Sequence, residues 1–542
     1  MNIKIGFLLL TITLVAAYLR LYHLDSLPPA LEWDEVATGF DAYSILKTGK
    51  DQYGNFLPLT MRSLDDYKPP LYTYMTSASI WVFGWNDFAV RFPAALLGIL
   101  AVVSTYLLTY ELIRSHPVAL MAALFLAVSP WHVNFSRLAL ETNSTIFFTT
   151  GGVWAFFRGL KYGPFLILSS VLLGLNLYLY HNARVFVPLL SIILIFLYYK
   201  ELLTQKRFVL IAALIAGLFS LRLIPILTSV EGQMRFSGTS IFTEAVPLDI
   251  YESKQNYANW RTDDTQQNMS FIGRLFHSEK TFFALRLLRN YLAHYDPNFW
   301  LFTNDTPRHH VSEMGILYFA DLPFIFIGLY WLFQLKNRRA AILQLSWFLL
   351  VPIPAAVTRD VPHALRTAIF LPTFQIFVAL AIIRLSKIRN TSFKHLILIS
   401  VSVIYALNVS FFLHQYFVHY AKDTSEYWEY GRKDAALFAE SIKADYNQVI
   451  VSTSLRHVYA FFLYYLRYDP VKYLNEGGTV SGGWAVEQNK FDKYHFRSFD
   501  FRNGKDGSTL FIGRPLDFPP ETPVLKKIYF LNGKEAIWIV SG

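Results

Sequence analysis

Residues 92–113 read FPAALLGILAVVSTYLLTYELI, an apolar run with a single charged residue close to its end. A run of about 20 apolar residues is long enough to cross the hydrocarbon core of a bilayer as an α-helix. The run does not alternate between apolar and polar residues, as the strands of a membrane β-barrel do. The segment therefore predicts a membrane-spanning helix.

Similar apolar runs recur along the 542 residues, of which 54% are hydrophobic and 17% aromatic. They predict a mainly α, polytopic helical membrane protein with about 11 spans. Residues 5–22 resemble a signal peptide, but the run is long and lacks a small-x-small cleavage site, which favours a retained helix. The expected spans lie at about 5–22, 92–113, 117–131, 144–159, 163–181, 185–200, 207–227, 313–334, 340–357, 367–385 and 393–414.

Positive charge predicts the orientation of these spans. The net charge is +10, and most basic residues between the expected helices gather in short loops on one side. Such loops face the cytoplasm, so the N-terminus is expected inside a plasma (inner) membrane and nucleic acid is not expected as a partner. The opposite face receives residues 23–91, 132–143, 182–184, 228–312, 358–366 and everything after 414.

Two domains are expected. Residues 1–414 form the membrane domain, with a first outer loop at 23–91 and a large outer loop at 228–312. Residues 415–542 are of ordinary domain size and predict an extracytoplasmic α/β domain. Residues 69–85 are apolar but short and begin with two prolines, which favours a helix in the outer interface over a second span. The expected strands lie at 448–452, 509–513, 526–531 and 535–540.

Charged residues that could take part in acid–base chemistry or phosphate binding follow the first expected span, residues 5–22. Asp34 and Glu35 come shortly after it, and a carboxylate at a membrane surface is costly unless it is solvated, paired or bound to a cation. Such a group can take a proton from an acceptor hydroxyl. Lys68 precedes two prolines that restrict its backbone, and Arg91 opens the next apolar run. Both cations could bind an anionic phosphate. Alternatively, they are solvated charges of the loop or anchors at the membrane interface.

Further polar residues occur in the other expected outer loops. Arg137 and Glu141 have the i,i+4 spacing of a helical ion pair, which is as well supported as a catalytic role. Arg359, His363 and Arg366 form an outer turn that suits a lipid phosphate or diphosphate, with headgroup contact as the alternative. The candidates for lining the site are Asp66, Tyr67, Arg137, Glu141, His181, Arg184, Arg308 and His309.

The sequence gives only a weak indication of a metal site and excludes thiol chemistry. The chain contains no cysteine, so it has neither disulfides nor thiolate ligands. Asp305, His309 and His310 suggest zinc, but their spacing fits no standard zinc motif. Asp65 and Asp66 either hold a cation or cap a turn. The sequence predicts no specific cofactor and leaves open whether the protein binds a divalent cation.

The order of these motifs resembles the GT-C membrane glycosyltransferases, and most closely the protein O-mannosyltransferases and the lipid A aminoarabinose transferase. The resemblance covers roughly residues 1–390. It departs from the family pattern at Glu141, where aspartate is usual, and at Tyr67, where the aminoarabinose enzymes have glutamate. The matching motifs are Trp-Asp-Glu at 33–35, Asp-Tyr-Lys-Pro-Pro-Leu at 66–71, Arg-Phe-Pro-Ala-Ala at 91–95, Ser-Arg-x-x-x-Glu at 136–141 and His-Ala-Leu-Arg at 363–366.

This resemblance implies an inverting enzyme that takes a sugar from a polyprenyl-phosphate carrier on the outer face of the membrane. It places the family's acidic pair on Asp34 and Glu35, with Asp34 as the base, and the donor-phosphate contacts on Lys68 and Arg91. A metal ligand at Asp66 would have to replace the missing glutamate.

Two other functions compete with that of an enzyme. A transporter or flippase for a lipid-linked or anionic substrate places charges near mid-membrane, whereas these charges gather in loops. A non-catalytic assembly protein with structural carboxylates is the other rival. The sugar is undetermined, and protein, lipid and glycan acceptors stay open.

Overall fold

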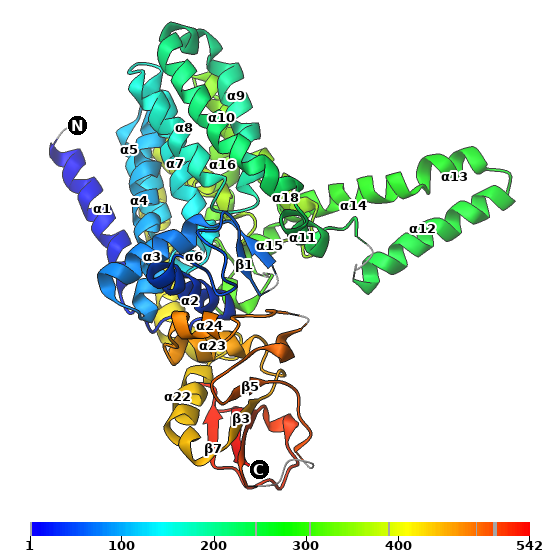
Figure 1. Cartoon of the computed structure of the whole chain (residues 1–542). Coiled ribbons are helices and arrows are strands. Elements are labelled where there is room, and N and C mark those ends of the chain that lie inside the picture. The colour runs from blue at the N-terminus through cyan, green and yellow to red at the C-terminus, as the bar shows by residue number, and fades with distance from the viewer. Residues whose placement is uncertain are drawn as a thin grey trace. The chain divides into compact units, whose positions relative to one another are not determined.

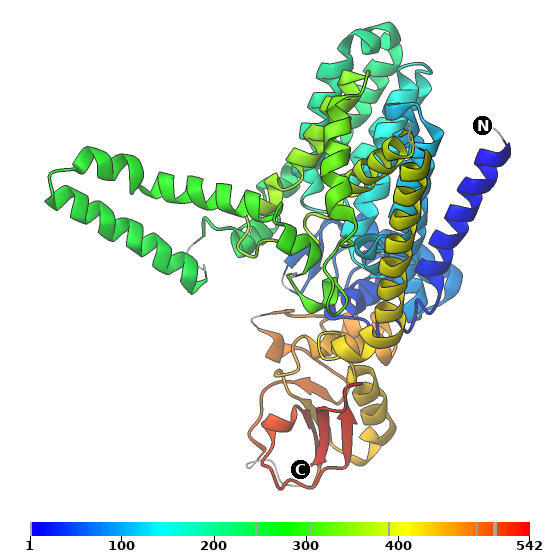
Figure 2. The ribbon, with the colours of Figure 1, turned by 180° about the vertical axis from the view of Figure 1, so that it is seen from behind.

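The computed structural model describes residues 3–64, 66–243, 247–302, 305–388, 391–483, 485–501 and 507–542 (Figures 1 and 2). Its contacts divide the chain into two compact units. Unit 1 comprises Met1–Ile12, Ala101–His132 and Thr145–Asn408, and unit 2 comprises Thr13–Leu100, Val133–Ser144 and Val409–Gly542.

A helix lies at each of the eleven segments that the sequence predicts to span the membrane. Among the residues that the structure describes, six stretches are long and apolar enough to cross a bilayer, and three shorter apolar helices accompany them. The expected multi-pass helical architecture is confirmed, whereas the number of spans stays a prediction. The eleven helices are α1 (Ile3–Leu21), α4 (Asp87–Ile113), α5 (His116–Val128), α7 (Glu141–Gly159), α8 (Pro164–Asn176), α9 (Ala183–Leu202), α10 (Lys206–Thr228), α16 (Asp321–Phe333), α17 (Arg338–Leu350), α19 (Thr373–Leu385) and α20 (Thr391–His414).

Unit 1 is built from packed apolar helices and a helical outer loop. Helix α19 packs against α5 and α16, and α8 packs against α10. The loop expected at 228–312 is mostly helical, and α12 and α14 run side by side as a hairpin (Figures 1 and 2). The other elements of unit 1 are η1 (Leu203–Gln205), α11 (Val230–Thr239), α12 (Leu248–Gln266), α13 (Ser270–Phe276), α14 (Glu279–Ala293), α15 (Pro297–Leu301), η2 (Pro307–His309), α18 (Ile353–Ala356) and η3 (Ala368–Phe370).

The first outer loop, in unit 2, folds into two helices and a small hairpin. These are α2 (Trp33–Thr48), β1 (Met61–Ser63), β2 (Asp66–Lys68) and α3 (Leu71–Phe83). Strands β1 and β2 pair antiparallel, with Met61 opposite Lys68. Helix α3 lies where an interfacial helix is expected, and its 13 residues are fewer than the roughly 20 of a span.

Helix α3 also completes the hydrogen bonding of α4. Pro93 lies inside α4 and has no N–H, so the carbonyl of Ala89 loses its helical donor. The hydroxyl of Ser79 in α3 donates to that carbonyl at 2.6 Å. The phenol of Tyr72 donates to the carbonyl of Val90 at 3.1 Å. These bonds fix the segment that follows Lys68 against the start of α4.

The C-terminal part of unit 2 contains a six-stranded mixed sheet. Its strand order is β4-β5-β3-β6-β8-β7, in which β3 pairs parallel with β5 and β6 and the other pairs are antiparallel. Aromatic residues such as Phe511, Phe518 and Trp538 pack in its core. The strands are β3 (Gln448–Val451), β4 (Lys490–Phe491), β5 (Tyr494–Phe496), β6 (Thr509–Gly513), β7 (Lys526–Tyr529) and β8 (Glu535–Ser541).

The four predicted strands of this region are present, at β3, β6, β7 and β8. The predicted domain boundary at 414/415 differs from the division by contacts, because Val409–Gly542 joins the first outer loop in unit 2. The remaining helices are α6 (Pro130–Phe135), η4 (Gln415–His419), α21 (Tyr420–Thr424), α22 (Arg432–Ile442), η5 (Lys443–Asp445), α23 (Val458–Tyr465), α24 (Pro470–Asn475), η6 (Val486–Gln488) and η8 (Pro515–Asp517).

Candidate active site

Asp34 and Lys68 form an ion pair in unit 2. Asp34 lies in the first turn of α2, and Lys68 ends β2 just before the two prolines. Nζ of Lys68 lies 2.5 Å from Oδ1 of Asp34, and their side chains are 10% and 28% exposed. The carboxylate is therefore the more accessible partner of a mostly buried pair.

Lys68 stays protonated in this position. Burial opposes its charge, but Asp34 and then Glu141 outweigh burial and hold the pKa of the ammonium above its usual value. Glu141 begins α7 and is buried. Lys68 is thus a fixed positive charge beside two carboxylates, and an anionic oxygen reaching its Nζ would have to compete with Asp34.

Arg91 is entirely buried and its donors are occupied. Nε and Nη2 lie 3.0 and 2.9 Å from the two carboxylate oxygens of Glu35. The remaining donors reach the backbone carbonyls of Leu24, Pro28 and Ala30. In this arrangement every guanidinium N–H is engaged, and Arg91 holds the chain that leads into α2. The expected contact of Arg91 with a donor phosphate stays a prediction.

Glu35 is likewise buried, and its carboxylate oxygens are engaged. It is 0% exposed, and besides Arg91 its carboxylate accepts the backbone N–H groups of Glu32 and Ala139 at 3.0 and 2.7 Å. The bond to Glu32 caps the N-terminus of α2. In the structure Glu35 fixes the turn that carries Asp34, and its expected catalytic role stays a prediction.

A second buried arginine stabilises the same turn. Arg137 donates to the carbonyls of Leu19, Tyr22 and Leu27 at 2.7–2.9 Å. It thereby satisfies carbonyl groups at and beyond the C-terminal end of α1. This role differs from both expectations for Arg137, the local ion pair with Glu141 and the lining of a site.

The remaining predicted residues of unit 2 lie on the hairpin. Asp66 and Tyr67 belong to β2 and are partly exposed, and Asp66 accepts the backbone N–H of Tyr67 at 2.9 Å. Asp65 lies outside the described residues. Within the part of the chain that the structure describes, Asp66 belongs to no group of residues with metal-ligand spacing.

His457 is a site residue that the sequence analysis missed. Its ring lies against Trp33 with centroids 5.3 Å apart, and its Nδ1–H donates to the carbonyl of Gly482 at 2.8 Å. Burial lowers its pKa, although Asp34 opposes this effect. Helix α23 reaches α2 because Gly39 leaves room for the ring of Tyr464. No motif surrounds His457, so the sequence offered no signal for it.

Asp41 of α2 is a buried acid beside this site. Its oxygens accept the backbone N–H and the side-chain amide of Gln52 at 2.9 and 3.1 Å, and Gln52 accepts the hydroxyl of Thr479. Burial, followed by the nearby Asp51, raises the pKa of Asp41 to about 8. The folded protein therefore keeps a proton on Asp41 at neutral pH.

This raised pKa predicts a pH-dependent stability. The stabilisation from this proton is fully present below the unfolded pKa of about 4 and is gone once the pH has risen through about 8. We expect the free energy of unfolding to fall between pH 5 and pH 8 by up to about 1.4 kcal/mol per pH unit from this group. Asp41→Asn should remove that component from unfolding curves measured across this range. An unchanged slope in the variant would contradict the assignment.

The other predicted site residues lie in unit 1. The amide of Asn182 donates to the backbone carbonyl of Arg366 at 2.7 Å, which brings the loop of His181 and Arg184 to that of His363. Nη1 of Arg184 lies 3.3 Å from Nδ1 of His181.

Arg366, Arg359 and His363 differ in their surroundings. Arg366 is buried and donates to the hydroxyl of Thr358 and the carbonyl of Asp360. Arg359 is partly exposed and donates to the carbonyl of Gly238. Burial and then Arg366 lower the pKa of His363. Arg308 and His309 lie in η2, and Arg308 is partly exposed. Donor-phosphate binding by Arg359, His363 and Arg366 stays a prediction.

Comparison with known proteins gives a family match for part of the chain. Residues 67–224 match the family described as dolichyl-phosphate-mannose-protein mannosyltransferase. This segment begins one residue before Lys68 and includes Arg91, Arg137 and Glu141. No curated protein sequence matches the chain.

Solved structures share the fold over nearly the whole chain. ArnT from Cupriavidus metallidurans bound to undecaprenyl phosphate is 13% identical, with a TM-score of 0.55, and the match covers 99% of this chain and 98% of that one. Its apo structure is 12% identical, with a TM-score of 0.54 and coverages of 98% and 97%. The Archaeoglobus fulgidus oligosaccharyltransferase tethered with an acceptor peptide is 13% identical, with a TM-score of 0.50 and coverages of 86% and 63%. The expected GT-C fold is confirmed.

Proposed function

We propose that this membrane glycosyltransferase of the GT-C type moves a sugar from a polyprenyl-phosphate carrier to an acceptor hydroxyl, with inversion at the anomeric carbon. The reaction takes place on the extracytoplasmic face of the plasma (inner) membrane. The observation that carries the proposal is the pair of Asp34 and Lys68, a partly accessible carboxylate 2.5 Å from a buried ammonium. The undecaprenyl phosphate bound by ArnT, which has the same fold, supports a polyprenyl-phosphate donor.

Asp34 is the base in the proposed reaction. An oxygen of its carboxylate accepts the proton of the acceptor hydroxyl while the acceptor oxygen forms a bond to the anomeric carbon. The bond from that carbon to the phosphate oxygen breaks, and its electrons leave with the polyprenyl phosphate. Attack from the side opposite the leaving group inverts the configuration.

Lys68 stabilises the leaving group. The departing phosphate gains negative charge, and a preorganised cation in a poorly solvated site stabilises that charge more strongly than water does. Lys68 is 10% exposed and is held protonated by Asp34 and Glu141. A phosphate that attracts Lys68 also weakens its hold on Asp34, so donor binding makes the carboxylate a better base.

The arginines and Glu35 position the reacting pair. Arg91, Glu35 and Arg137 fix the backbone between α1 and the first turn of α2, where Asp34 lies. Transport is not favoured as the alternative function, because the matching family and the solved structures of this fold are transferases.

Replacing Lys68 by glutamine tests donor binding. A hydrogen bond to a charged group contributes about 1.5–3 kcal/mol, so kcat/KM for the donor should fall about 10–150-fold. The measurement is release of labelled sugar from a polyprenyl-phosphate sugar by purified protein in membranes. Lys68→Arg should recover part of the loss because it keeps the charge.

Lys50 supplies the matched control, since it is exposed and lies on the same outer loop. Lys50→Gln should leave sugar release unchanged. Wild-type kcat/KM in Lys68→Gln would remove Lys68 from the donor site. Absence of any sugar release by the wild-type protein from a panel of polyprenyl-phosphate sugars would count against the proposed function itself.

A further inference from the structure

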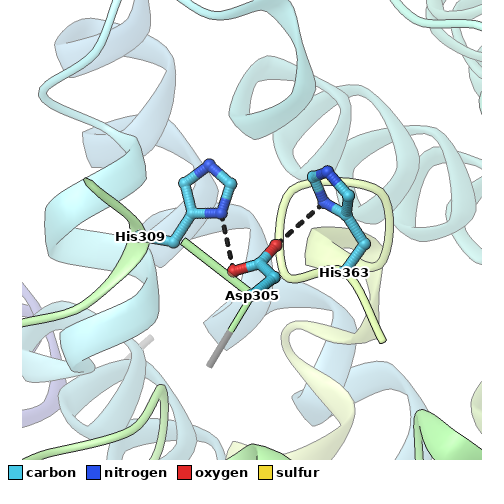
Figure 3. Close-up of side chains that lie close together, drawn as sticks. All are labelled: Asp305, His309 and His363. Atoms are coloured by element: carbon cyan, nitrogen blue, oxygen red, sulfur yellow. Dashed lines mark hydrogen bonds and ion pairs between the residues drawn. The ribbon is translucent and has the colours of Figure 1, made fainter. Parts of the chain in front are cut away.

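Three metal-ligand side chains from separate segments meet in unit 1. Asp305 and His309 lie between α15 and the end of η2, whereas His363 comes from the loop between α18 and η3. One donor atom from each of the three lies within 4.8 Å of those from the other two. Figure 3 shows the carboxylate between the two imidazoles, one facing each oxygen.

The distances are close to those of a shared ion. Nδ1 of His309 lies 2.8 Å from Oδ1 of Asp305, and Nδ1 of His363 lies 3.0 Å from Oδ2. Ligands about 2.0–2.2 Å from a tetrahedral zinc ion are about 3.3–3.6 Å apart. The side chains would have to separate by about 0.3–0.8 Å to admit an ion.

The backbone holds the carboxylate in place. Oδ1 accepts the backbone N–H of Thr306 at 2.8 Å, and Oδ2 accepts that of Ala364 at 2.9 Å. Ala364 directly follows His363, so this bond fixes the second loop against Asp305. Hydrogen bonds of this kind orient the ligands of known metal sites.

His363 provides a second, independent observation. Its Nδ1 is buried and, within the described part of the chain, makes no hydrogen bond, because the direction toward Asp305 is poor although the distance is 3.0 Å. A buried polar atom without a hydrogen bond is costly and calls for a reason. A bond to a metal ion would satisfy this nitrogen.

We propose that Asp305, His309 and His363 bind one divalent transition-metal ion of the Zn²⁺ class. Two imidazole nitrogens and a carboxylate oxygen suit this class, and three protein ligands leave a fourth position for water or for an anionic oxygen. The site differs from the zinc hypothesis drawn from the sequence. His310 is not a member, because its Nδ1 faces the carbonyls of Val311 and Met314.

The local charge permits a dication. Arg366 is the nearby cation, and Asp360 partly offsets it with a carboxylate oxygen 3.4 Å from Nη2. The side chains of Asp305, His309 and His363 are 7%, 8% and 16% exposed, so an ion entering the site would lose most of its water. Coordination by the protein can compensate for the lost water only if all three side chains bind the ion.

Metal content measures this proposal directly. The full-length protein is purified in detergent without chelator, incubated with Zn²⁺, freed of unbound metal and analysed by mass spectrometry for zinc per chain. We expect close to one ion per chain in the wild type and background content in the His309→Gln/His363→Gln double variant. Co²⁺ loaded in place of Zn²⁺ should give visible absorption bands that the double variant lacks.

Three further variants make the result specific. His277 pairs with Asp264 at 2.6 Å, and no third ligand joins them among the described residues, so His277→Gln should keep the metal. His363→Gln alone should weaken Zn²⁺ binding at least about 10-fold and serves if the double variant does not fold. Asp34→Asn should keep the metal, which separates this proposal from the proposed function. A wild type without zinc, or a double variant that retains it, overturns the site and leaves a carboxylate that lies between two imidazoles without an ion.

Discussion

Replacing Asp34 by asparagine is expected to slow sugar transfer by about 10²–10⁴-fold, the usual contribution of a general base. Asparagine has the size of aspartate and can still accept a hydrogen bond from Lys68, so the local packing should survive. It cannot take a proton from the acceptor hydroxyl. The loss should therefore appear in kcat at saturating donor, measured as labelled sugar transferred per enzyme, and not in the affinity for the polyprenyl phosphate.

Asp25 provides the control for this experiment, because it is exposed and lies on the same outer loop. Asp25→Asn should transfer sugar at the wild-type rate. Both variants should unfold cooperatively, which shows that Asp34→Asn inserts and folds, although it should unfold more easily than the wild type because the buried Lys68 loses its charged partner. Wild-type turnover by Asp34→Asn would falsify its role as the base.

Breaking the pair of Arg91 and Glu35 is expected to have the largest effect on stability. Both side chains are 0% exposed, and removal of one partner leaves the other charge buried without compensation. Such changes cost about 3–5 kcal/mol. Arg91→Met and Glu35→Gln should both lower the free energy of unfolding by this amount, as measured by denaturation in detergent. The double variant should lose less than the sum of the two, since neither charge then remains.

An ion pair with an exposed lysine in the same unit supplies the comparison. Nζ of Lys433 lies 3.4 Å from Asp87, and the lysine is 52% exposed. Lys433→Met should cost no more than about 1 kcal/mol. If Arg91→Met unfolds like the wild type but binds polyprenyl phosphate more weakly, Arg91 contacts the donor after all and the structural role assigned to it is wrong.

Much of the fold could be predicted from apolar runs and strand patterns. Each of the eleven expected spans coincides with a helix, because a run of about 20 apolar residues can satisfy its backbone in lipid as a helix. The strands at β3 and β6 could be predicted for a similar reason, since short runs of β-branched and aromatic residues favour strands. These are local properties, and the chain carries them whatever its tertiary structure.

The roles of individual charges could not be predicted in the same way. Asp34 and Glu35 are neighbours in sequence, yet one is partly exposed beside Lys68 and the other is buried against Arg91. Their positions in the first turn of α2 direct the two carboxylates to different partners. The order of the motifs predicts a catalytic role for both acids, because neighbouring positions in the sequence do not show where each side chain points.

The sequence by itself determined that this chain is a multi-pass helical protein and which segments become helices, since hydrophobic length and helix formation act along the chain. Only the tertiary structure decided which charges are exposed and which are buried and paired. It brought His457 against Trp33 and joined His363 to Asp305, contacts between residues far apart in sequence. Such contacts depend on packing between distant segments, and no local pattern encodes them.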